Sequence, residues 1–80
     1  MNPIYRVMMR RRDSDNWEIW TNYPSFDDAE LAACGLITGG TASEAHIWQV
    51  SADDKRIVAC VNSVKKAGWP HGAAVVSKVS

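Results

Sequence analysis

Two cysteines, no excess charge and no long apolar run set the first limits on this chain of 80 residues. Cys34 and Cys60 are too few for the disulfide scaffold of a small secreted domain, and no charged and apolar leader segment opens the sequence. No apolar run approaches the roughly 18 residues that span a bilayer. We therefore expect a cytoplasmic protein with reduced cysteines and no membrane association.

The charges of the chain cancel, because nine basic residues are matched by nine acidic ones. A zero net charge disfavours a protein that depends on bulk attraction to nucleic acid or to an anionic membrane. It equally disfavours an acidic mimic of DNA. Local charged patches remain compatible with this balance, and they must be judged one at a time.

Metal-binding and catalytic motifs are also missing. The residues Cys34, His46, Cys60 and His71 are separated by 11, 13 and 10 intervening residues, whereas zinc ligands are paired about two to five residues apart. The glycines of Thr38–Thr41 follow a helix, but a phosphate-binding loop follows a strand. We expect no metal, no cofactor and no enzyme activity; an enzyme would need His46 or His71 to meet a cysteine or a carboxylate in space.

One long helix is predicted between Ser25 and Gly39. Ser25 is a good N-cap, and Asp28, three residues later, gives a variant of the capping box. Gly39-Gly40 ends the helix because glycine tolerates the left-handed conformation. Apolar residues between these ends recur at spacings of three and four, which is the pattern of one buried helical stripe: Phe26, Ala29, Ala33, Leu36 and Ile37.

Strands are predicted at 4–12, 17–23, 46–51 and 56–62, and a fifth at 73–79, either at an edge of the sheet or exchanged with a partner. The first two form a hairpin around the turn Asp13–Asn16, with Arg10 opposite Trp20, and a single helical turn is expected at 63–68. This order predicts one α+β domain: an antiparallel sheet of four to five strands (ββαββ and a fifth C-terminal strand) with one helix packed on one face. The other face is open, and function is to be sought there first.

Arginine and tryptophan are the residues that favour binding to a partner. The run Arg10-Arg11-Arg12 lies on one strand with Arg6, although arginines at a strand end also serve as ordinary edge protection. We expect Trp17 in the core, Trp20 and Trp48 as an aromatic pair on the open face, and Trp69 either as a surface anchor or as a residue that folds the tail onto the sheet. Since tryptophan and arginine dominate interface hot spots, the predicted partner-binding residues are Arg6, Arg10, Arg11, Arg12, Trp20, Trp48 and Trp69.

The hairpin YRVMMRRR–WEIW, the helix SFDDAELAACGLI and the closing hairpin HIWQVS–RIVACV give a layout similar to that of small phage-encoded proteins. These include anti-CRISPR inhibitors of multi-subunit bacterial surveillance complexes. The resemblance covers residues 4–62, concerns size and element order, and carries no functional residue across. It implies a protein that inhibits or modulates a larger host protein complex by stoichiometric binding, in the cytoplasm of a bacterial host.

Nucleic-acid binding by the same Arg6–Arg12 hairpin patch is the alternative function. Lys55-Arg56 and Lys65-Lys66 would extend the basic patch, and Trp20 would add a platform on which a base stacks. Exposed strand edges and the C-terminal strand would also allow two copies to pair as a homodimer.

Overall fold

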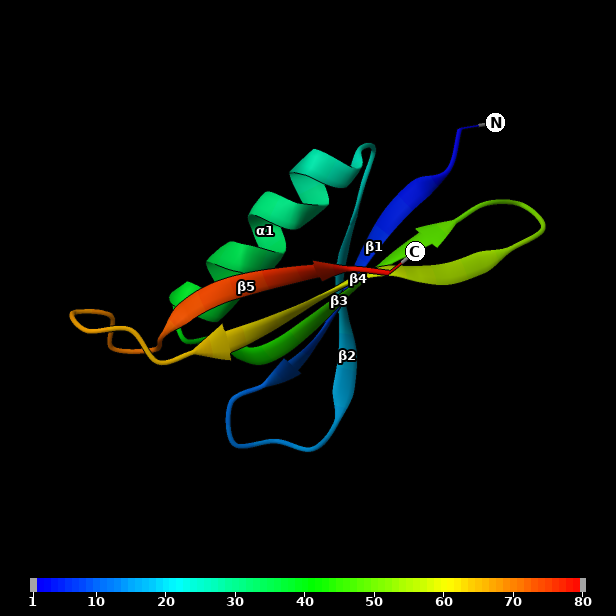
Figure 1. Ribbon diagram of the computed structural model, residues 1–80. Helices are drawn as coiled ribbons and strands as arrows, with labels where there is room; N and C mark the ends of the chain where they lie inside the picture. Colours follow the sequence, from blue (N-terminus) through cyan, green and yellow to red (C-terminus); the bar gives the residue numbers. More distant parts are fainter. Residues whose placement is uncertain (1, 80) are drawn as a thin grey trace.

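A computed structural model describes residues 2–79 as one antiparallel sheet with a single helix on one face (Figure 1). The strand order is β2-β1-β3-β4-β5, so β2 and β5 are the edge strands. The predicted α+β fold is confirmed, with the fifth strand in place. No helix in this part of the chain is long and apolar enough to cross a membrane. The elements are β1 (Ile4–Arg11), β2 (Trp17–Tyr23), α1 (Phe26–Thr38), β3 (Ala42–Val50), β4 (Lys55–Val64) and β5 (Ala73–Lys78).

Helix α1 begins and ends at the residues that the sequence indicates. The backbone N–H of Asp28 donates to Ser25 Oγ at 3.2 Å, so Ser25 is the N-cap. At the other end Gly39 is the C-cap with an ordinary φ of −80°, and Gly40 takes the left-handed conformation with a φ of 83°. The N–H of Thr41 then donates to the carbonyl of Leu36 at 3.0 Å, which closes the helix and turns the chain into β3.

The hydrophobic core lies between α1 and the sheet, and α1 contacts all five strands. Two helix alanines, Ala29 and Ala33, are fully buried, so the helix backbone packs close to the sheet. Tyr5 and Phe26 meet edge to face with ring centroids 6.1 Å apart and extend this core beyond its buried centre. The buried apolar residues are Val7, Met9, Ala29, Ala33, Leu36, Ile37, Ala42, Ala45, Ile47, Ala59 and Val61.

The register of the β1–β2 hairpin differs from the prediction. Arg10 lies opposite Trp17, not Trp20, and Met8 lies opposite Ile19. Two local features cause the shift: the chain leaves β1 after Arg11 to form a longer turn, and a bulge between Val7 and Met8 leaves Trp20 without a register partner. Register partners share a sheet face, so the hairpin displays a different set of side chains from the one predicted.

Strands β3 and β4 are longer than their sequence patterns indicate. Ala42 already pairs with Arg11, so β3 begins four residues before the strand predicted at 46–51. Val64 pairs with Ala73, so residues 63 and 64 belong to β4 and not to the helical turn predicted at 63–68. Each extension lies beside a neighbouring strand that pairs with it, and such pairing satisfies backbone hydrogen bonds irrespective of weak local preference.

Candidate partner-binding surface

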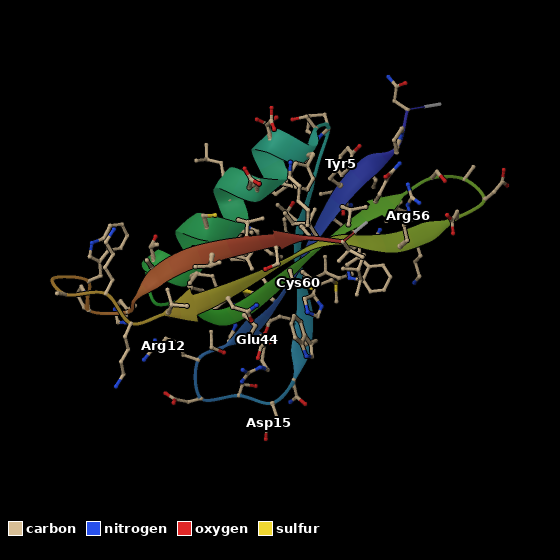
Figure 2. The ribbon with its side chains drawn as sticks, viewed as in Figure 1. Tyr5, Arg12, Asp15, Glu44, Arg56 and Cys60 are labelled. Atoms are coloured by element: carbon tan, nitrogen blue, oxygen red, sulfur yellow. The ribbon has the colours of Figure 1, made fainter. Side chains whose placement is uncertain are left out.

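The sheet face opposite α1 carries apolar and aromatic side chains from four strands. They line two hollows, one of about 280 Å³ and one of about 150 Å³, which share Met8 and Trp48. The shared residues join the two hollows into one surface, which we call the open-face patch. Figure 2 shows the two sides of the sheet: Tyr5 lies on the side that α1 covers, and Glu44 lies on the opposite side. The open-face patch comprises Met8, Trp17, Ile19, His46, Trp48, Val50 and Ile57.

Strand alternation places these residues on that face. Val7 and Met9 are fully buried under α1, so Met8 between them points away from the helix. The same holds for His46 between two fully buried residues of β3, Ala45 and Ile47. Ile19 is the register partner of Met8, and Ile57 is the register partner of Trp48, so both isoleucines lie on the same sheet face as these residues.

Trp17 stacks on His46 within the open-face patch. The ring centroids are 4.2 Å apart and the ring planes differ by 22°. Trp17 is 38% exposed, so its predicted place in the core is wrong. The cause is the hairpin register, which pairs Trp17 with Arg10 instead of turning it toward α1.

Trp48 has a lysine, not a second tryptophan, as its neighbour. Lys55 Nζ lies 5.9 Å from the ring centroid of Trp48, at the outer limit of a cation–π contact. Trp20 is 43% exposed at the bulge of edge strand β2, and it lines neither hollow of the open-face patch. The predicted Trp20–Trp48 pair is therefore wrong, because the bulge takes Trp20 out of the β1–β2 pairing.

Burial lowers the pKa of His46 below its ordinary value of 6.5, and this effect outweighs the opposite effect of the nearby Glu44 carboxylate. The imidazole is packed on Trp17 and lies opposite Met8 on β1 and Cys60 on β4. Protonation would place a charge within an apolar surface. The open-face patch is therefore neutral at this position near neutral pH.

We expect this lowered pKa to make the folded state less stable in mild acid. The unfolded chain binds a proton at His46 more readily than the folded chain does, so the His46 contribution is present above about pH 6.5 and is lost as the pH falls through the lower pKa of the folded state. The contribution of His46 is measured by urea unfolding of the wild type and of His46→Gln between about pH 7.5 and pH 5. The wild type should lose more stability than the variant; parallel losses would contradict the effect.

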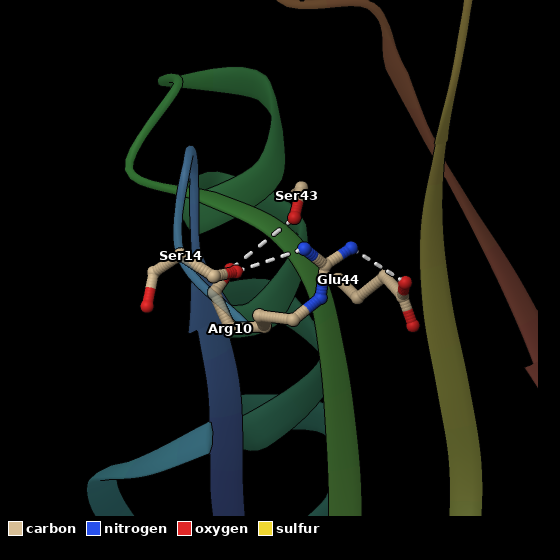
Figure 3. Close-up of polar contacts among 4 residues, drawn as sticks. All are labelled: Arg10, Ser14, Ser43 and Glu44. Atoms are coloured by element: carbon tan, nitrogen blue, oxygen red, sulfur yellow. Dashed lines mark hydrogen bonds and ion pairs between the residues drawn. The ribbon is translucent and has the colours of Figure 1, made fainter. Parts of the chain in front are cut away.

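Arg10 and Glu44 form an ion pair beside the open-face patch, with Nη2 and Oε1 2.7 Å apart (Figure 3). Arg10 Nη1 also donates to the carbonyl of Ser14 at 3.0 Å, and Ser43 Oγ donates to the Arg10 carbonyl at 3.4 Å. The Arg10 guanidinium is thus held by groups of the protein itself. Its charge neutralises that of Glu44, so neither residue leaves a free charge at the border.

The remaining charges at the border of the open-face patch are positive. Arg6 Nε donates to the neutral Asn22 Oδ1 at 3.0 Å, and Lys55 lies over Trp48. Neither Arg6 nor Lys55 takes part in the two ion pairs found among residues 2–79. A partner that covers the apolar centre would therefore meet two cations at its rim.

The predicted binding residues do not gather on one surface. Arg6 and Trp48 lie at the open-face patch, but Arg11 Nε donates to Glu18 Oε2 at 3.1 Å on exposed parts of β1 and β2. Arg12 and Trp69 line another hollow at one end of the sheet. Six residues of the open-face patch were not among the predicted binding residues. Trp17 was expected in the core, and the other five follow the alternation on the second face of each strand: Met8, Ile19, His46, Val50 and Ile57.

The basic patch is also not extended by Lys55-Arg56. The N–H of Arg12 donates to Thr41, just before β3, whereas Lys55 pairs with Val50 at the end of β3. Figure 2 shows Arg12 and Arg56 at opposite ends of the sheet. The predicted extension of the basic patch from the β1–β2 hairpin to the β3–β4 turn is therefore wrong.

A cysteine and a histidine do meet on the open face. Cys60 lies opposite His46 in the β3–β4 register. No hydrogen bond joins the two side chains among the described residues, because the imidazole is stacked on Trp17, and the nearest carboxylate, Glu44, is paired with Arg10. The pair thus lacks the nucleophile–base hydrogen bond expected in covalent catalysis.

Both cysteines are free thiols, and burial, with a smaller effect from Glu30, raises the pKa of Cys34. Within residues 2–79 no group of three or more histidine, cysteine, aspartate or glutamate side chains is placed to hold a metal ion.

Comparison with protein-family models found no matching family, and comparisons with curated proteins and with solved structures found no match. By its fold the chain is a small α+β domain with one sheet face under a helix and the other uncovered. Its function must be inferred from the side chains on these surfaces.

Proposed function

We propose that this protein is a non-enzymatic binding module that docks a protein partner on the open-face patch and so inhibits or modulates a larger assembly. The observation that carries the proposal is the make-up of the open-face patch. Two tryptophans and aliphatic side chains occupy its centre, and unpaired cations lie at its border. Protein interfaces have this arrangement, with an apolar aromatic core inside a polar rim.

The aliphatic residues favour a protein over a nucleic acid as the partner. Met8, Ile19 and Ile57 offer packing area but no flat surface on which a base could stack. The ring of Trp17 is stacked on His46, and Lys55 lies over Trp48. Single-stranded nucleic-acid sites instead combine free aromatic faces with a groove of cations.

The border charges define the chemistry of the partner. Arg6 and Lys55 have the same sign, and the Glu44 carboxylate beside the patch is already neutralised by Arg10. The complementary surface is an apolar protrusion flanked by acidic side chains. The resemblance of size and element order to anti-CRISPR inhibitors suggests a multi-subunit surveillance complex as an assembly with such a surface.

The test is capture of the partner with matched charge variants. Trp48→Glu places a carboxylate in the open-face patch, and Leu31→Glu places the same group on α1, where Leu31 is 77% exposed. A protein captured by the wild type is purified and titrated by calorimetry. We expect a stoichiometric complex that Trp48→Glu weakens by about 30-fold or more, as loss of a hot spot worth at least about 2 kcal/mol requires, and that Leu31→Glu leaves intact.

Three outcomes would contradict the proposal. Equal affinities of the two variants would remove the open-face patch from the interface. Binding of generic oligonucleotides that Trp48→Glu abolishes and salt weakens steeply would favour the nucleic-acid alternative. Sedimentation of the wild type as a dimer that Trp48→Glu converts to a monomer would show that a second copy of the chain covers the patch. Circular dichroism of each variant confirms that it is folded.

A further inference from the structure

A hollow of about 600 Å³ lies at one end of the sheet and shares no residue with the open-face patch. It is bounded by Arg12, just after β1, and by the β4–β5 connection. Figure 1 shows this connection projecting beyond the strands near the C-terminal end of α1. The volume falls in the range of roughly 300–1,000 Å³ that small-molecule sites occupy.

The β4–β5 connection has a defined conformation. The N–H of Trp69 donates to the Lys66 carbonyl and the N–H of Gly72 donates to the Trp69 carbonyl, each at 3.1 Å, so two turns follow one another. Ser63 Oγ donates to the His71 carbonyl at 2.8 Å and ties the second turn to β4. The hollow is therefore formed before any ligand arrives.

Positive charge gathers around this hollow. Arg12, Lys65 and Lys66 line it, and no aspartate or glutamate is among its lining residues. None of the three takes part in the ion pairs found in the described residues. Asp13 and Asp15 line a neighbouring hollow that Arg12 also borders. Like charges that converge on one cavity raise the local concentration of anions.

The side chains of Trp69 and His71 complete the lining. Trp69 is 44% exposed, and Lys66 Nζ lies 4.6 Å from its ring centroid. His71 packs so closely on Gly40 that a Cβ there would lie 2.6 Å from the imidazole. His71 Nδ1 is buried, and no hydrogen-bond partner for it exists among the described residues.

We propose that this hollow binds a nucleoside phosphate, with the phosphates on Arg12 and Lys65 and the base on the face of the Trp69 ring opposite Lys66. Arginine binds phosphate oxygens in bidentate fashion, and tryptophan stacks with any base. A free nucleotide and the terminal nucleotide of a single strand share this chemistry. The proposal does not depend on the open-face patch, so either can fail alone.

The test is an NMR titration of the full chain with ATP, tripolyphosphate, adenosine and a short oligothymidylate. ATP should shift the amides of 63–72 and the indole N–H of Trp69, and should bind about tenfold or more tightly than tripolyphosphate or adenosine, since base stacking is worth about 1–3 kcal/mol. Tighter binding of the oligothymidylate than of ATP would assign the site to a strand end, and the reverse would assign it to a free nucleotide.

Matched variants separate a built site from general attraction. Lys65→Gln/Lys66→Gln should weaken ATP about tenfold or more, whereas Lys55→Gln/Arg56→Gln, which removes the same charge at the opposite end of the sheet, should not. Trp69→Leu should reduce ATP binding more than tripolyphosphate binding. The proposal is overturned if ATP leaves 63–72 unshifted, if both lysine variants lose affinity equally, or if tripolyphosphate binds as well as ATP.

Discussion

Replacing Ile37 with alanine should lower the free energy of unfolding by about 2–5 kcal/mol. Ile37 is fully buried between α1 and the sheet, so the change removes apolar contact and leaves a cavity. A domain of 80 residues has a total stability of about 4–12 kcal/mol at the usual value per residue. The variant should therefore lose a large share of the total stability and unfold at a clearly lower urea concentration, as urea unfolding followed by tryptophan fluorescence would show.

Leu31→Ala is the matched control for this change. It removes an aliphatic side chain of similar size from the same helix, but from a position that is 77% exposed. We expect its free energy of unfolding to stay within about 0.5 kcal/mol of the wild type. Equal losses in Leu31→Ala and Ile37→Ala would mean that α1 does not present this stripe to the sheet.

Gly72→Ala should be the most damaging change in the β4–β5 connection, at about 2–5 kcal/mol. Gly72 has a φ of 84°, and a Cβ there would lie 2.5 Å from both Ser63 Oγ and the Val64 carbonyl oxygen. The substitution combines left-handed strain with a clash against backbone. It would also break the hydrogen bond from Ser63 to His71, and thermal unfolding would measure the loss.

Gly68→Ala isolates the strain from the clash. Gly68 has nearly the same φ, 83°, but nothing lies within 4 Å of its added Cβ. Its cost should be only the left-handed penalty, about 1–2 kcal/mol. If the two alanine variants lost the same stability, the tight contact of Gly72 with β4 would be absent in solution.

Local rules account for what the sequence predicted well. The cap at Ser25, the stripe that includes Ala33 and Ile37, and the stop at Gly39-Gly40 each depend on residues a few positions apart. The order of strands and helix along the chain, and a sheet with one face covered by the helix, also followed from these patterns. These features need no knowledge of distant pairing.

The misses arise from pairing between strands. The hairpin register depends on a bulge at Trp20, which no local sequence pattern predicts. This register places Trp17 and Ile19 on the open face. Consecutive arginines cannot share a surface, because Arg10 and Arg11 point to opposite faces of β1 and Arg12 lies beyond it. The sheet has the predicted uncovered face, but most of the side chains on that face were not among the predicted binding residues.

The native cysteines give the most direct test of a partner on the open face. Cys60 lies on that face opposite His46, whereas Cys34 lies on α1. The alkylation rate of each thiol is measured by mass spectrometry with and without the purified partner. At a partner concentration near 100 times Kd, alkylation of Cys60 should slow by up to about 100-fold while that of Cys34 is unchanged. Alkylation of Cys60 at the free rate while the partner stays bound would contradict the account.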